Sequence, residues 1–195
     1  VVHRGPRHDG PGPEVRDLRG KWMLPAFVDS HCHILPTGLD LQKLHLGSAE
    51  SPEDVLDLLR DRHLSHPNGW LHAVHYDQNR YPGGVHMTRD HLDGISATRP
   101  ILLRHVNGHA SVANSAALVA AGIDDATPNP SGGEIVRDAA GRATGVLLEA
   151  AHELVSAVEP GPGFEEMVEA IMLAGAKMRQ LGIACATDMM TGRFD

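Results

Sequence analysis

The sequence changes from apolar to polar within Pro-Ala-Phe-Val-Asp-Ser-His-Cys-His, residues 25–33. Residues 26–28 have the composition of a buried strand, and the polar residues after them are typical of a functional loop at its end. In an extended segment, residues two apart point to the same side, so we expect His31 and His33 to project together and Cys32 to point away. Two imidazoles held in this way can share one divalent metal ion.

The same motif has a plainer interpretation. For an isolated His-x-His, a pair of surface histidines at a strand end is the more frequent outcome. A catalytic zinc ion normally takes three protein ligands and a water molecule, so His31 and His33 need a third ligand from elsewhere. Because Cys32 faces away from them, we expect it to be a packed thiol and not a nucleophile.

Outward from this stretch, helical and strand patterns alternate. Ser51-Pro52-Glu53-Asp54 predicts a helix start, because it combines a serine cap, a first-turn proline and acids near the positive end of the helix dipole. The patterns predict strands at 70–75, 100–106 and 183–188, a helix at 111–121, a hairpin from 134–137 and 144–148, and helices at about 148–158 and 164–181. The expected fold class is therefore α/β.

The composition excludes several kinds of function. The 195 residues carry 17 Lys and Arg against 25 Asp and Glu, a formal net charge of −8, so we expect no nucleic-acid partner. No apolar run approaches the roughly 20 residues that a membrane span requires. Two cysteines far apart argue against a disulfide framework and favour the cytoplasm.

Residues 25–33 resemble the first barrel strand of the amidohydrolase superfamily, whose usual form is Pro-Gly-Phe-Ile/Val-Asp-Ser/Ala-His-x-His; Ala26 replaces the glycine. Further segments follow the order of the amidohydrolase family 3 branch, the YtcJ-like hydrolases: residues 76–84, 88–93, 100–104, 107–110, 114–118, 132–138 and 145–149. Asn107 stands where that branch usually has Asp. The resemblance covers about residues 14–190, and the ordered set of segments is far more specific than any one of them.

The resemblance implies a metal-dependent hydrolase on a (β/α)8 TIM barrel. Such a barrel typically needs about 250 residues, so we expect only part of it here. Residues 1–24 would be the end of an N-terminal β-sandwich or a linker, and residues 25–195 the N-terminal portion of the barrel domain. Barrel strands 1 and 2 would lie near 26–33 and 183–188, with a long α+β insertion at about 45–160 between them.

The implied activity is hydrolysis of an amide, N-acyl or formamide-like C–N bond by a metal-activated water, with zinc as the expected metal. His31 and His33 would bind the metal. Glu149, which closes a family-like segment, is a candidate third ligand; an exposed acid in the first turn of a helix is the alternative. We expect the general base beyond Asp195, so that the fragment alone is inactive.

His109, Tyr76 and Asp77 are the candidate substrate-binding residues. His109 lies between Gly108 and Ala110, and a buried, hydrogen-bonded histidine is an equally good interpretation. For Asp77, an ion pair with Arg80 that fixes a loop is the alternative.

Two other hypotheses remain open at this stage. The chain could be a catalytically inactive scaffold that needs a partner, or its missing C-terminal half, to cover exposed strand edges. It could also belong to a related deaminase or lactam hydrolase with the same His-x-His start. The expected partners are a small-molecule substrate and, as a homo-oligomer, further copies of the chain.

Overall fold

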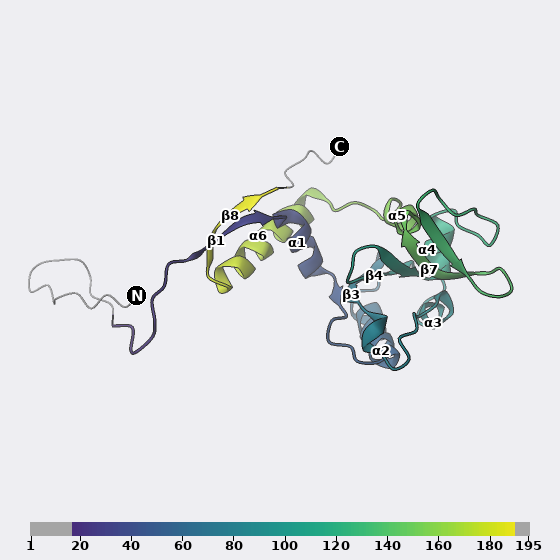
Figure 1. Ribbon diagram of the computed structural model, residues 1–195, viewed down its shortest axis with the longest axis horizontal. Coiled ribbons are helices and arrows are strands. Elements are labelled where there is room, and N and C mark those ends of the chain that lie inside the picture. The colour runs from purple at the N-terminus through teal and green to yellow at the C-terminus, as the bar shows by residue number, and fades with distance from the viewer. Residues whose placement is uncertain (1–16, 190–195) are drawn as a thin grey trace, which may run out of the picture.

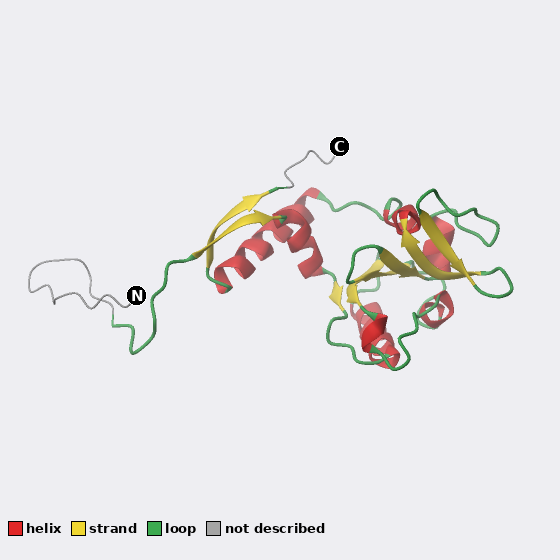
Figure 2. Cartoon of the chain, viewed as in Figure 1, coloured by secondary structure: helices red, strands yellow, loops and turns green. Residues whose placement is uncertain are grey.

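The computed structural model describes residues 17–189, which form two lobes (Figure 1). The first lobe contains a two-stranded sheet of β1 (Phe27–Cys32) and β8 (Ile183–Asp188), beside which α1 (Ile34–Gln42) packs on α6 (Phe164–Gln180). The second lobe, between α1 and α6, contains a six-stranded sheet with its own helices (Figure 2). The mixed α/β class is confirmed; the partial barrel stays a prediction.

The two strands of the first lobe come from opposite ends of the described chain. They pair in parallel, with Val28 opposite Cys185 and Cys32 opposite Asp188. Parallel strands need a long crossover connection, and here the crossover comprises α1, the second lobe and α6. The strands expected at 26–33 and 183–188 are confirmed as elements. Part of the expected segment 1–24, residues 1–16, lies outside the described residues.

Neither strand of this pair is as buried as its composition predicts. Phe27 and Val28 are 65% and 68% exposed, and Cys185 is also exposed. The reason is that each strand has only the other as a neighbour within residues 17–189. Apolar side chains that a larger sheet would cover are therefore left open to water.

Helices α1 and α6 approach each other closely at Gly38. A Cβ atom at this position would lie 1.9 Å from the carbonyl oxygen of Ala170. Ala170 and Ala174 are the buried residues of α6. Small residues on both helices thus allow the two backbones to come together.

The sheet of the second lobe has the strand order β2-β3-β4-β5-β7-β6. Its strands are β2 (Leu44–His45), β3 (Leu71–Tyr76), β4 (Ile101–His105), β5 (Ala110–Ala113), β6 (Gly133–Arg137) and β7 (Ala143–Glu149). The β2-β3-β4 pairings are parallel, and the remaining pairings are antiparallel. The associated helices are α2 (Pro52–Ser65), η1 (Gln78–Arg80), α3 (Arg89–Asp93), α4 (Ser115–Ala120) and α5 (Ala150–Ser156).

Strand periodicity explains how this sheet builds a core on both faces. In β4, Ile101 and Leu103 join one buried cluster, whereas Leu102 joins the other. Successive side chains of a strand point to opposite faces, so an uninterrupted apolar strand fits a sheet covered on both sides. The first cluster includes Val55 and Leu59 of α2, and the second includes residues of α4 and α5.

Local capping sets the helix boundaries. The Ser51 hydroxyl accepts a hydrogen bond from the Asp54 amide (3.2 Å), and the Asp54 carboxylate accepts one from the Ser51 amide (3.1 Å). This capping box confirms the predicted start of α2. Among the described residues, no helix has both the length and the apolar character that crossing a bilayer requires.

The helix expected at 111–121 is wrong at its start. Residues up to Ala113 belong to β5, and α4 begins only at Ser115. The fully buried Asn114 accepts a hydrogen bond from the Ala117 amide and donates to the carbonyls of Ser96 and Arg99. Asn114 therefore caps the helix, while residues 111–113 pair with β4 and β7.

Candidate functional site

His31 and His33 meet at the C-terminal end of β1. Their ring centroids are 5.4 Å apart in an edge-to-face arrangement, which confirms that the two side chains project together. His31 is exposed, whereas His33 is half-buried and precedes α1 as its N-cap residue. The Nδ1 atom of His33 is buried and has no hydrogen-bond partner. A buried polar atom without a partner costs about 1–3 kcal/mol, so this nitrogen is suited to bind a ligand.

The neighbours of the two histidines come from both strands. The Asp29 carboxylate accepts a hydrogen bond from the His31 amide (3.1 Å), and the Cys32 thiol donates to the Thr187 carbonyl (3.4 Å). Desolvation and the charges of Asp29 and Asp188 raise the pKa of the Cys32 thiol. A thiol with a raised pKa that points to β8 fits the expected packing role and not a nucleophile.

A second pair of polar side chains, His109 and Glu149, lies in the second lobe. His109 Nδ1 is 3.2 Å from a Glu149 carboxylate oxygen, with the two side chains 68% and 63% exposed. The Glu149 amide also donates to the His109 carbonyl at 2.7 Å. The interpretation of His109 as a buried histidine is therefore wrong. An imidazole oriented by a carboxylate is an arrangement that proteins use for acid–base chemistry.

Glu149 has an unusual backbone conformation. It ends β7 and is the N-cap residue of α5, with a φ of 49°. Such a φ is strained for a residue other than glycine and is found mainly where the surrounding structure or a function imposes it. Its side chain is exposed and makes no cap hydrogen bond with α5. The alternative of an exposed acid at the start of a helix therefore agrees with its position, and its side-chain contact is with His109.

The structure does not bring Glu149 to the two histidines of β1. Within residues 17–189, no three His, Cys, Asp or Glu side chains are close enough to hold a metal ion. Glu149 contacts His109 instead. Its role as a metal ligand stays a prediction.

Tyr76 and Asp77 have structural contacts. Tyr76 is fully buried, and its hydroxyl accepts a hydrogen bond from the Met87 amide (2.8 Å), so it offers no surface to a ligand in this structure. Burial raises the pKa of the Tyr76 hydroxyl, and this effect is larger than the opposing effect of the hydrogen bond from Met87. Asp77 caps η1 by accepting from the Asn79 amide (3.1 Å). Arg80 donates to the Gly47 carbonyl, which differs from the alternative interpretation of an Asp77–Arg80 ion pair.

Sequence reasoning missed a group of polar residues inside the apolar strands of the second lobe. His72 of β3 is only 9% exposed at its side chain and is hydrogen-bonded through Nδ1 to Glu159 at 2.7 Å. Arg104 of β4 forms an ion pair with Asp40 of α1. The available signal was a basic residue within an otherwise apolar strand, because such a residue needs a partner when the strand is covered.

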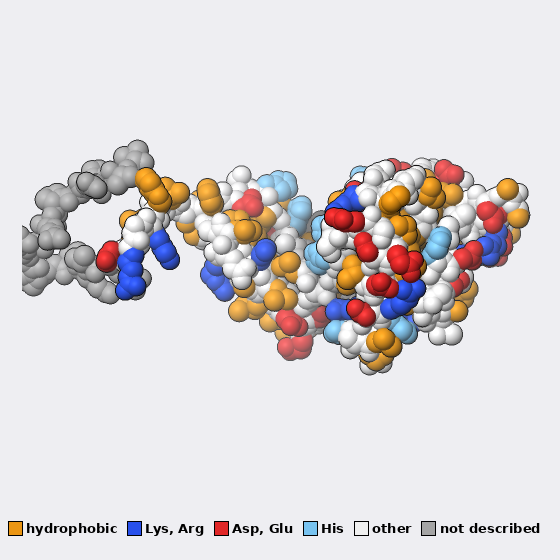
Figure 3. Space-filling model, turned by 90° about the horizontal axis from the view of Figure 1, so that it is seen from below, with side chains coloured by type: hydrophobic (Ala, Val, Ile, Leu, Met, Phe, Trp, Pro, Cys, Tyr) orange, Lys and Arg blue, Asp and Glu red, His pale blue; other side chains and the backbone are white. Residues whose placement is uncertain are grey.

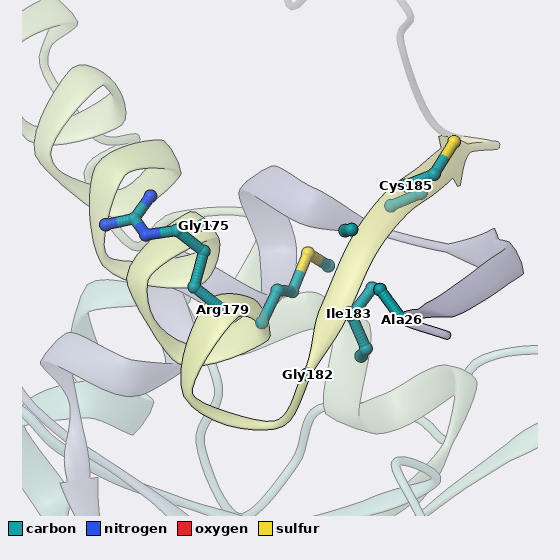
Figure 4. A pocket seen from close by; sticks show the side chains of 9 residues that line it. Ala26, Gly175, Arg179, Gly182, Ile183 and Cys185 are labelled. Carbon is teal, nitrogen blue, oxygen red and sulfur yellow. The ribbon is translucent and has the colours of Figure 1, made fainter. Parts of the chain in front are cut away.

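A hollow of about 610 Å³ lies in the first lobe between α6 and β8 (Figure 4). Ile183 and Cys185 of β8, Ala26 just before β1, and Gly175 and Arg179 of α6 line it. Its lining contains no His, Asp or Glu. The hollow therefore lacks the carboxylates and imidazoles that most often serve as acid–base groups.

The sequence profile of the amidohydrolase family matches residues 14–195. The chain belongs to the amidohydrolase family. Among related proteins, this amidohydrolase chain is 35% identical over 187 residues to YtcJ of Bacillus subtilis (strain 168), which is named as an amidohydrolase; the match covers 95% of the chain and 34% of YtcJ. It is 38% identical over 157 residues to the N-substituted formamide deformylase of Arthrobacter pascens, covering 74% of the chain and 27% of that protein.

A solved structure has a fold similar to that of this amidohydrolase chain. The chain is similar to a metal-dependent hydrolase of uncharacterised function from Pyrococcus horikoshii OT3, with a TM-score of 0.61 and 26% identity over 85% of this chain and 31% of that one. The chain thus spans about a third of the length of the proteins it matches.

Proposed function

We propose that the protein to which this chain contributes is a metal-dependent hydrolase that cleaves C–N bonds of amide, N-acyl or formamide type. The observation that carries the proposal is the meeting of His31 and His33 at the end of β1, with His33 Nδ1 buried and without a partner. A divalent cation at this nitrogen would remove the cost of leaving it unpaired. The two imidazoles would thus supply two of the ligands that a metal ion needs, and imidazole suits zinc.

A bound divalent metal would lower the pKa of a coordinated water to about 7 and polarise the scissile carbonyl. In this proposal His31 and His33 hold the ion through their imidazoles, and Asp188 lies opposite Cys32 at the same end of the strand pair. Glu149 is the proposed third ligand, and His109 and Asp77 are proposed to contact the small-molecule substrate. The general base is proposed to lie beyond Asp195.

The fold supports this arrangement as part of a (β/α)8 barrel. In such barrels the active site lies at the C-terminal ends of the strands, the end at which β1 carries its histidines. β1 and β8 would be the first two barrel strands, and the second lobe the insertion between them. The C–N bond is proposed because one relative is named as an N-substituted formamide deformylase.

A second candidate is a catalytically inactive chain that must be completed by a partner, by a further copy of itself or by more of its own sequence. The observation that favours it is the exposure of apolar side chains on the first lobe, including Val28 at 68% and Met172 at 64%. Such a surface is typical of an interaction site.

Metal content per chain tests the proposal directly, by mass spectrometry of the purified 195-residue chain and of two variants. We expect about one divalent ion per chain, its loss in His31→Ala, and its retention in His66→Ala, which changes an exposed histidine at the end of α2. Equal metal content in all three proteins would contradict the proposed site. A metal-containing chain that is catalytically silent, beside a full-length protein that hydrolyses N-substituted formamides, would show that the site is right and the chain incomplete.

A further inference from the structure

A cavity of about 490 Å³ lies between the C-terminal end of α1 and the sheet of the second lobe. Six of its lining side chains are basic, namely Lys43, His72, His75, Arg104, His105 and His152, whereas two are acidic, Asp40 and Glu159. The chain as a whole has a formal net charge of −8, so this concentration of basic groups contrasts with the rest of the molecule. Figure 3 shows histidine side chains at the indentation between the two lobes.

Both acidic side chains of the cavity already have basic partners within it. Asp40 forms ion pairs with Arg104 and, at 3.5 Å, with Lys43. Glu159 accepts a hydrogen bond from His72. The negative charge in the cavity is therefore balanced by its own walls. Arg104 has five N–H donors, and its side chain is 34% exposed, so donor capacity is left for a ligand.

His72 provides a buried group without a complete set of partners. Its side chain is 9% exposed, Nδ1 lies 2.7 Å from Glu159, and Nε2 is buried with no hydrogen-bond partner. When Glu159 is ionised, Nδ1 must carry the proton of that hydrogen bond. Nε2 is then the ring atom that remains for a ligand, and in the protonated ring it is a donor to an oxyanion.

The pKa shifts of two groups that line the cavity agree with a ligand of negative charge. Burial alone would raise the pKa of Glu159, yet the hydrogen bond from His72 and the charges of His72, Lys43 and Arg104 lower it. Burial lowers the pKa of His152, and although Glu153 opposes this shift, the charges of Arg104, His109 and His72 add to it. A field that favours a carboxylate and disfavours a further cation suits an anionic ligand.

We propose that this cavity is a binding site for a small organic acid, held through its carboxylate by Arg104 and Lys43 and bordered by the unpartnered Nε2 atom of His72. The guanidinium fork of Arg104 matches the planar geometry of a carboxylate. With the histidines neutral, Lys43 and Arg104 balance Asp40 and Glu159, and the N–H donors that these two cations keep beyond their ion pairs with Asp40 are available to a carboxylate. The volume lies within the range of about 300–1,000 Å³ that is typical of small-molecule sites.

This site goes beyond the proposed hydrolysis and does not depend on a metal ion. None of its lining residues belongs to β1. Gly108, which lines the cavity, precedes His109, and His152 follows Glu149 by three residues. His109 and Glu149 are thus neighbours of the cavity residues in sequence, but neither of them lines the cavity.

Calorimetric titration of the 195-residue chain in the presence of a chelator tests the proposal. The probes are N-acetylglycine, its neutral counterpart N-acetylglycinamide and inorganic phosphate. We expect saturable binding of one N-acetylglycine per chain and no binding of the amide. Equal binding of acid and amide, or absence of binding, would overturn the site. Tighter binding of phosphate than of the acid would overturn the assignment to a carboxylate.

Variants locate the binding in the cavity. Arg104→Gln should weaken the binding of N-acetylglycine about ten- to a hundredfold, the range for loss of one hydrogen bond to a charged group. Arg60→Gln, which changes an exposed arginine of α2, should leave it unchanged. Should thermal unfolding show that Arg104→Gln does not fold, Lys43→Gln carries the same test. Full affinity in a folded Arg104→Gln or Lys43→Gln chain would contradict the proposal.

Discussion

Both lobes contain strands and helices rich in apolar residues, but these side chains are buried in the second lobe and largely exposed in the first. In the second lobe, Leu103 and Leu147 are fully buried, whereas in the first lobe Val28 is 68% exposed. Helix α6 shows the same contrast, because only Ala170 and Ala174 among its residues are buried, although it carries many larger apolar side chains. Its exposed large apolar residues are Phe164, Val168, Ile171, Met172 and Leu173.

The difference lies in the number of neighbours that the chain itself supplies. The second lobe has six strands and covers both faces of its sheet with its own helices. The first lobe has two strands and a pair of helices. Burial of an apolar surface contributes roughly 25 cal/mol per Å², so a surface left open contributes nothing to folding. We therefore expect the second lobe to be the stable part of this chain.

Truncation of a core side chain in each lobe gives the largest contrast. Leu103→Ala should lower the free energy of unfolding by about 2–5 kcal/mol, because it removes a fully buried side chain and leaves a cavity. Val28→Ala should change it by less than about 0.5 kcal/mol, since most of that side chain already contacts water. Denaturant titration monitored by circular dichroism measures both. An equal loss of unfolding free energy in the two variants would show that the Val28 side chain of β1 is covered in solution.

A substitution in the first lobe tests whether the lobes unfold separately. Gly38→Ala places a methyl group against the Ala170 backbone and should destabilise the packing of α1 on α6 by about 1–3 kcal/mol. Hydrogen exchange should accelerate in α1, α6 and the strand pair while the second lobe keeps its protection. Gly161→Ala, where nothing lies within 4 Å of the added atom, is the matched control. Faster exchange throughout the chain would show that the lobes are one cooperative unit.

The smallest expected effect concerns the cap of α2. The hydrogen bond from the Glu50 amide lowers the pKa of Asp54 below its ordinary value of 3.8, and the hydrogen bonds with Ser51 lower it further. A carboxyl whose pKa is lower in the folded state stabilises the fold above its unfolded pKa, and this contribution is lost as the pH falls through the folded value. Asp54→Asn should therefore lower Tm at pH 6 and have less effect near pH 2–3.

Thermal unfolding of Asp54→Asn at several pH values, beside Asp61→Asn on the same helix, measures this dependence. Ser51→Ala, which removes the other half of the capping box, should cost about 1 kcal/mol. A Tm difference between wild type and Asp54→Asn that does not vary with pH would contradict the assigned role of the carboxylate.

Several features could be predicted from the sequence because their cause is local. The capping box of α2, the β6–β7 hairpin and the joint projection of His31 and His33 depend on residues that are close in the chain. Local periodicity also identified most strands and helices. It could not place the start of α4, because residues 111–113 pair with strands distant in sequence and the burial of Asn114 fixes the cap.

The sequence by itself determined the family and the α/β class, since ordered motifs and periodic patterns are properties of the chain. Only the tertiary structure decided which apolar segments are buried and which polar groups meet. His109 and Glu149 come together because β7 ends beside the loop that carries His109. Lys43, His72 and Arg104 line one cavity because the C-terminal end of α1 meets the parallel strands β3 and β4. Such contacts join residues tens of positions apart, and no local spacing encodes them.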